Sequence, residues 1–192
     1  KVGNSLQVVN YKYNIRGWLT DINDVAALGG KLFAYKINYN TEDTDISGVV
    51  PLYNGNISET LWRTAKDNIL RKYGYKYDKL NRLSGAYYQK PNATEPETNS
   101  YNETVSYNKN GNILRLQRNG GLDNAVPPVE IDDLTYKYHA TNKNQIVKVT
   151  DQSNSPQGFS DIAIEGQDDY TYDANGSLRT DLNKGIADIT YN

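Results

Sequence analysis

The decapeptide Gly74-Tyr75-Lys76-Tyr77-Asp78-Lys79-Leu80-Asn81-Arg82-Leu83 contains the pattern that decides the fold. From Tyr77 onward it reads Tyr, Asp or Asn, two free positions, Gly or Asn, one free position, and then Leu or Ile. The same pattern recurs in three further stretches, Tyr13–Leu19, Tyr107–Ile113 and Tyr172–Leu178. Four copies in a chain of 192 residues make it an internal repeat.

Each position of the pattern has a physical role in a tight turn. The side chain of Asn or Asp bonds to the backbone two residues on, and Gly or Asn three positions later can adopt a positive φ. Together they predict a β-hairpin tip, a type I turn closed by a G1 bulge. The residues predicted to build these tips are Tyr13, Asn14, Gly17, Tyr77, Asp78, Asn81, Tyr107, Asn108, Gly111, Tyr172, Asp173 and Gly176.

Large side chains spaced by two precede the tips, which predicts strands with one apolar face. The pairs are Tyr11/Tyr13, Tyr75/Tyr77, Val105/Tyr107, Tyr136/Tyr138, Tyr170/Tyr172 and Ile189/Tyr191. We expect this tyrosine-rich face to be the buried one. Degraded copies of the pattern begin at Tyr53, at Tyr138 and at Tyr191, and the copy at Tyr138 should form a longer tip.

The remainder of the chain favours strands and loops over helices. Strand-like runs cover residues 6–13, 31–40, 57–64, 69–77, 113–118, 145–150 and 177–180. Helix signal is limited to residues 24–28 and 58–67, and the second of these alternates better as a strand. We expect one all-β stretch of tandem hairpins over residues 1–192, with loop excursions near 90–100, 119–132 and 151–167.

Composition excludes several classes of function. The net charge is −2 and the charges are mixed along the chain, so no basic stripe is present to bind nucleic acid. The mean hydropathy of −0.77 and the absence of long apolar runs argue against a membrane span. There is no Cys, which excludes disulfides and thiolate chemistry. There is also no Met, and we interpret the sequence as a fragment of a longer protein.

Three groups of residues are candidates for chemistry or binding. His139 is the only histidine, and it lies where the repeat places Asn or Asp, so we interpret it as a turn residue. Acidic clusters at 21–24, 42–45, 132–133 and 168–169 lack the Gly and Glu spacing of a calcium loop. Trp18 and Trp62 could stack on sugar rings, although they fit an apolar sheet face better. We therefore predict no catalytic residue, no metal site and no cofactor.

The Tyr-Asp consensus followed by Gly-x-Leu or Gly-x-Ile resembles the RHS/YD-repeat family, in particular the arrays of large RHS proteins of Bacteroidetes-type bacteria. The phrases Tyr11–Leu19, Gly74–Leu83 and Tyr170–Gly176 carry the resemblance, which covers nearly the whole chain. It implies that successive hairpins join edge to edge into a long antiparallel sheet, a segment of a spiralling hollow shell. It further implies a structural, non-enzymatic scaffold that encloses or presents a C-terminal toxin in a secreted or cell-surface bacterial protein.

The resemblance also indicates partners. The expected ones are adjoining repeats and a plug or toxin of the same polypeptide, although the Asp-Pro-x-Gly signature and the autoproteolytic Asp pair of the family are absent from this sequence. The alternative is a carbohydrate-binding cell-surface adhesion module, whose partner would be a glycan.

Overall fold

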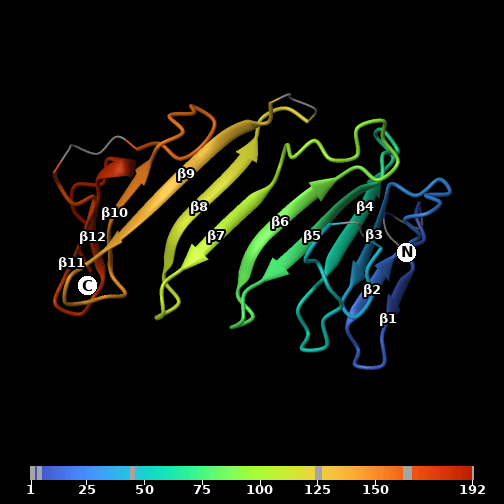
Figure 1. The fold of residues 1–192 in the computed structure, drawn as a ribbon, viewed down its shortest axis with the longest axis horizontal. Helices are drawn as coiled ribbons and strands as arrows, with labels where there is room; N and C mark the ends of the chain where they lie inside the picture. The colour runs from blue at the N-terminus through green and yellow to red at the C-terminus, as the bar shows by residue number, and fades with distance from the viewer. Residues whose placement is uncertain (1–2, 4–5, 44–45, 124–126, 162–165, 192) are drawn as a thin grey trace. The chain divides into compact units, whose positions relative to one another are not determined.

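The computed structural model describes residues 3, 6–43, 46–123, 127–161 and 166–191. The chain forms two compact units, of which unit 1 comprises residues 1–102 with 123–126 and unit 2 comprises residues 103–122 with 127–192. Apart from one short 3-10 helix, η1 (Leu182–Lys184), the regular structure of the described residues is all β-strand (Figure 1). The all-β prediction is confirmed.

Unit 1 contains an antiparallel sheet in which each strand pairs with the next one along the sequence. Its strands are β1 (Tyr11–Tyr13), β2 (Leu19–Ile22), β3 (Phe33–Asn38), β4 (Glu59–Thr64), β5 (Arg71–Tyr77) and β6 (Leu83–Gln89). Residues 24–28 form no helix, and 59–64 form a strand, as their alternation predicts.

Unit 2 follows the same rule of sequential antiparallel pairing. Strands β7 (Glu103–Tyr107), β8 (Ile113–Gly120), β9 (Val129–Tyr138) and β10 (Ile146–Asp151) pair in this order. The last hairpin, β11 (Tyr170–Tyr172) and β12 (Leu178–Asp181), forms a separate two-stranded sheet.

The excursions differ in how much strand they contain. Residues 90–102 are irregular throughout. The second stretch is strand only at its two ends, because β8 runs to Gly120 and β9 begins at Val129, and residues 124–126 of the connection lie outside the described part. In the third, residues 152–169 connect β10 to β11, and residues 162–165 lie outside the described part. No helix in the described part is long and apolar enough to cross a membrane.

For unit 1, the prediction that the tyrosine-rich face is the buried one is wrong. Tyr11 and Tyr13 are 54% and 61% exposed, and on β5 it is the alternating residues Lys72 and Gly74 that are buried. The reason is that other parts of unit 1 pack against the opposite face of the sheet. The apolar core there consists of Val25, Leu28, Ala34 and Leu61, with Leu70 packed against it, so the connection after β2 closes over β3 and β4.

In unit 2 the prediction describes β9 and β10 correctly. Tyr136 lies opposite Val149, so the two side chains share a face, and Leu134 and Val147 are on that face as well. Leu134, Val147 and Val149 are buried, whereas Thr135 and Lys137 on the other face are exposed.

Candidate functional site

The repeat tips form a set of nearly identical turns. At the tip between β5 and β6, Asp78 Oδ1 accepts hydrogen bonds from the backbone N–H groups of Leu80 (2.8 Å) and Arg82 (3.0 Å). Equivalent pairs of bonds end on Asn14, Asn108 and Asp173. The guanidinium of Arg82 hydrogen-bonds to Asp78 Oδ2 and holds the pKa of this carboxyl below its usual range. In the four full copies the atom that accepts these bonds is therefore a carboxylate or an amide oxygen.

The fifth motif position, the Gly or Asn, has a positive φ in all four full copies. The values are 74° at Gly17, 62° at Asn81, 90° at Gly111 and 84° at Gly176. In each hairpin the strand register shifts at the motif tyrosine, as a bulge requires. A Cβ at Gly17 or Gly111 would meet no atom within 4 Å. Glycine is favoured there because of φ and not for lack of space.

The motif tyrosines make a second recurring contact, which we call the tyrosine clamp. The hydroxyl of Tyr77 donates to the backbone carbonyl of Ile57 at 2.9 Å, and Ile57 ends the preceding copy of the motif. Four other tyrosines bond to the corresponding Leu or Ile: Tyr39 to Leu19 (3.1 Å), Tyr138 to Ile113 (2.8 Å), Tyr172 to Ile146 (2.9 Å) and Tyr191 to Leu178 (2.9 Å). Each clamp ties one hairpin to the hairpin before it.

Sequence reasoning missed the clamp, although one signal for it was present. An apolar face accepts Phe as readily as Tyr, yet the chain has 17 Tyr and only 2 Phe. A demand for the hydroxyl explains that ratio. Burial raises the pKa of Tyr39, Tyr77, Tyr138 and Tyr172, so their hydroxyls stay protonated and able to donate at neutral pH.

The degraded copies keep parts of this arrangement. At the second tip, Asn54 and Gly55 (φ 98°) form the turn, but the clamp comes from Tyr39, while Tyr53 is 70% exposed. The Tyr39-Asn40 doublet was the overlooked sequence signal. At the tip after β9, His139 Nδ1 accepts from the N–H groups of Thr141 (3.2 Å) and Asn142 (3.0 Å), so the histidine takes the place of Asn or Asp.

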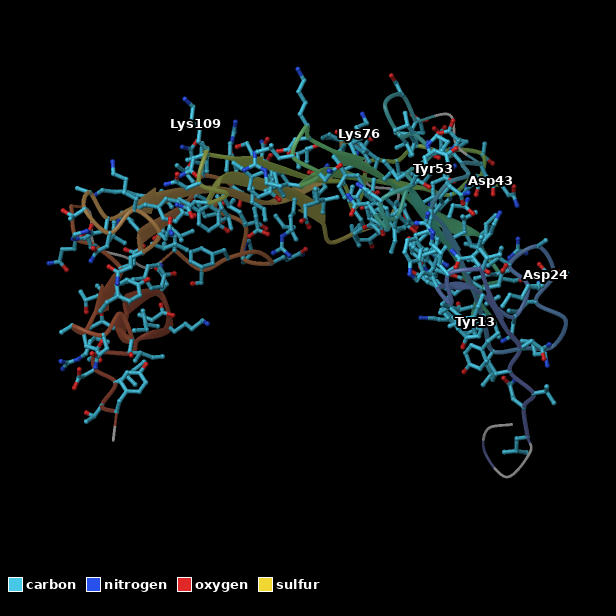
Figure 2. All side chains as sticks on the ribbon, turned by 90° about the horizontal axis from the view of Figure 1, so that it is seen from below. Tyr13, Asp24, Asp43, Tyr53, Lys76 and Lys109 are labelled. Atoms are coloured by element: carbon cyan, nitrogen blue, oxygen red, sulfur yellow. The ribbon has the colours of Figure 1, made fainter. Side chains whose placement is uncertain are left out.

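The remaining motif tyrosines have other surroundings. Tyr13 ends β1 and is mostly exposed, and Tyr107 ends β7 and is half-buried. Figure 2 shows Tyr13 on one side of unit 1 and Asp43 and Lys76 on the other. Of the last degraded copy, Asn192 lies outside the described residues.

Side-chain hydrogen bonds also connect neighbouring tips. In unit 1, Arg16 Nη1 donates to the carbonyl of Tyr53 at 3.2 Å, and Asn54 Nδ2 donates to Asn81 Oδ1 at 3.0 Å. In unit 2, Asn112 Nδ2 donates to the carbonyl of Lys143 at 2.7 Å. These bonds fix the spacing of adjacent hairpins at their turn ends.

The two tryptophans make internal ring contacts. The guanidinium of Arg16 lies over the Trp18 ring, 5.1 Å from its centroid, and the Tyr39 ring is 5.2 Å away. Trp62 stacks on Tyr73 with ring centroids 5.7 Å apart and also contacts Tyr88. A ring face covered in this way is not open for stacking on a sugar.

In three of the four acidic clusters, aspartates are paired with cations. Asp43 bonds to Lys36, Asp132 to Arg118, Asp133 to Arg115, and Asp169 to Lys148. Residues 44 and 45 of the second cluster lie outside the described part. Within the part that the structure describes, no group of three or more His, Cys, Asp and Glu side chains could hold a metal ion.

No protein-family model and no curated protein sequence matches this chain. Solved structures of similar arrangement include the crystal structure of TcdB2-TccC3-TEV, with a TM-score of 0.48 and 10% identity over 90% of this chain. A structure of the Photorhabdus luminescens Tc holotoxin pore carrying a TccC3 mutation matches with a TM-score of 0.46 and 12% identity, again over 90%. This chain spans about a tenth of the length of either of those chains.

Proposed function

We propose that this chain is a wall segment of an RHS-type shell and that its role is structural. The observation that carries the proposal is the tyrosine clamp, which occurs five times and joins a tyrosine to the Leu or Ile that ends the preceding copy of the motif. A contact that links each repeat to its neighbour stabilises an extended array, because every repeat buries surface only against adjacent repeats.

The sequential pairing of strands supports the same role. A hairpin that pairs with the hairpins before and after it leaves open strand edges only at the ends of the array. The motif residues are used for turns and clamps, and the proposal assigns none of them a catalytic role. From the family resemblance we infer the finer role, which is to enclose or present a C-terminal toxin in a secreted or cell-surface bacterial protein.

Limited proteolysis of the complete natural polypeptide that contains this sequence tests the proposal. We expect the region C-terminal to the repeats to resist protease while the wall is intact. A Tyr77→Ala and Tyr172→Ala double variant should expose that region to digestion, because two clamps and their ring packing are lost together. The matched control is Tyr53→Ala, since the Tyr53 side chain is 70% exposed.

Two results would contradict the proposal. One is equal digestion of the C-terminal region in the wild type and in the double variant. The other is a double variant that keeps the wild-type urea midpoint, which would show that the clamped tyrosines do not hold the wall together.

A further inference from the structure

A cavity of about 610 Å³ opens in unit 1 between the end of β4 and the loop that follows β6. This volume is within the range of small-ligand pockets. Its lining combines side chains that can donate hydrogen bonds with apolar ones. Its lining includes Arg63, Asn68, Ile69, Leu70, Asn92 and Thr94.

Arg63 differs from the other arginines of the chain. Of the seven arginines, five form ion pairs with aspartates, and Arg16 lies over the Trp18 ring. Arg63 forms no ion pair with any described residue, and its Nη1 has only a long bond of 3.4 Å to Asn68 Oδ1. Its buried Nε has no hydrogen-bond partner among the described residues. An unsatisfied buried donor is costly, and a charge-assisted bond to an anion would remove that cost.

The charges around the cavity select the kind of anion. Lys90 also lines it, but its ammonium group is 3.1 Å from Asp123 Oδ1 and is already compensated. Glu95 adds one negative charge at the rim. With a single uncompensated guanidinium, the site suits a monoanion better than a doubly charged phosphate.

We propose that this cavity binds a small carboxylate-bearing, hydroxylated ligand of the uronic acid type. The guanidinium of Arg63 would hold the carboxylate, because its planar fork matches a carboxylate in bidentate geometry. Asn68, Asn92 and Thr94 offer amide and hydroxyl groups to ligand hydroxyls, and Ile69 and Leu70 offer an apolar surface to its C–H groups. The site is separate from both tryptophans and does not depend on the wall role.

Titration of the 192-residue chain with glucuronate, followed by calorimetry or by amide shifts in NMR, tests this site. We expect saturable binding to glucuronate and none to glucose at the same concentrations. Arg63→Gln should weaken binding roughly tenfold or more, since it removes a charge-assisted bond. Arg63→Lys should bind glucuronate more weakly than the wild type but more tightly than Arg63→Gln. Glu95→Gln should bind glucuronate more tightly than the wild type.

Arg82→Gln is the matched control, because Arg82 belongs to the same unit and is paired with Asp78. It should leave glucuronate binding unchanged. Three outcomes would overturn the proposal: no saturable binding of glucuronate, equal binding by Arg63→Gln and the wild type, or binding of inorganic phosphate in preference to glucuronate. An unchanged urea midpoint of Arg63→Gln would verify that the variant is folded.

Discussion

Strands β5 and β9 end in almost the same sequence, Gly74-Tyr75-Lys76-Tyr77 and Thr135-Tyr136-Lys137-Tyr138, yet they are buried differently. On β9 the buried Leu134 shares a face with the half-buried Tyr136 and Tyr138, and on the opposite face Thr135 and Lys137 are exposed beyond the buried Asp133. On β5 the tyrosines are also half-buried, but the opposite face carries the buried Lys72 and Gly74. The repeat therefore fixes the turn and the strand register, but it does not fix which face becomes the core.

The cover over β5 comes from the long connection between β3 and β4. A Cβ at Gly74 would lie 2.7 Å from Ile46 Cδ1 and 3.0 Å from Val49 Cγ2, which places that connection directly on the strand. Beneath it, Glu59 is fully buried and its Oε1 is 3.7 Å from Lys72 Nζ. Glu59 Oε2 accepts bonds from Asn38 Nδ2 and from the N–H of Asp43. The connection is thus held by a buried, charged cluster.

The largest expected effect comes from comparing the buried Lys72 on β5 with the exposed Lys137 on β9. Lys72→Met leaves Glu59 buried without its counter-charge and should lower the free energy of unfolding by about 3–5 kcal/mol. Lys137→Met is the control, because the Lys137 side chain is 66% exposed and its ion pair with Asp168 is a surface pair. Its cost should stay below about 1 kcal/mol. Similar urea midpoints for the two variants would contradict the assigned burial.

Exchanging the residues that precede the two Tyr-Lys-Tyr segments sharpens the comparison. Gly74→Thr places a side chain against Ile46 and Val49 and should cost about 1–3 kcal/mol through overpacking. The reverse exchange, Thr135→Gly, changes an exposed position and should cost roughly 0.5–1 kcal/mol through backbone entropy alone. Thermal unfolding of both variants measures the difference. A Gly74→Thr variant as stable as the wild type would show that β5 is not closely covered.

Substitutions at a hairpin tip test the turn geometry that the hairpins of both units share. Gly111→Val forces a β-branched residue into a left-handed conformation and should cost about 1–2 kcal/mol or more. Gly111→Asn should be tolerated, since Asn81 occupies the equivalent position with φ 62°. Melting temperatures distinguish the two variants, and equal values would refute the role of the positive φ.

Removing a single clamp hydroxyl should give the smallest effect. Tyr77→Phe and Tyr138→Phe each delete one hydroxyl bond to a carbonyl and should cost about 1 kcal/mol in either unit. Tyr53→Phe, whose ring is mostly exposed, should cost close to nothing. Urea midpoints that are unchanged in all three variants would remove the clamp as a source of stability.

Alkaline titration provides an independent check of the clamps. Burial raises the pKa of Tyr77 and Tyr138 in the folded chain above the ordinary value of 10.0. Above that pH the unfolded chain loses the tyrosine protons while the folded chain keeps them, so the free energy of unfolding falls. The contribution is complete below pH 10 and is lost as the pH rises through the raised pKa. The Phe variants should show a shallower decline than the wild type.

The local structure of this protein could be predicted from its sequence. Asn or Asp followed three positions later by Gly or Asn determines the turn, because the bonds that Asp78 Oδ1 accepts from the N–H groups of Leu80 and Arg82 lie within one short segment. The same local reasoning predicted the turn role of His139 and the strand at 59–64. It did not identify Tyr39 as a clamp, because 16 residues separate its Tyr-Asn doublet from Ile57.

Only the tertiary structure decided which strand faces are buried and where charges can be enclosed. The alternation of Tyr75 and Tyr77 is the same as that of Tyr136 and Tyr138, but on the first of these strands Ile46 and Val49 pack against the face opposite the tyrosines, at Gly74. The Arg63 cavity likewise depends on a loop that follows β6 coming to lie beside the end of β4. Side-chain period is a property of one strand, whereas burial depends on whichever distant segment packs against it.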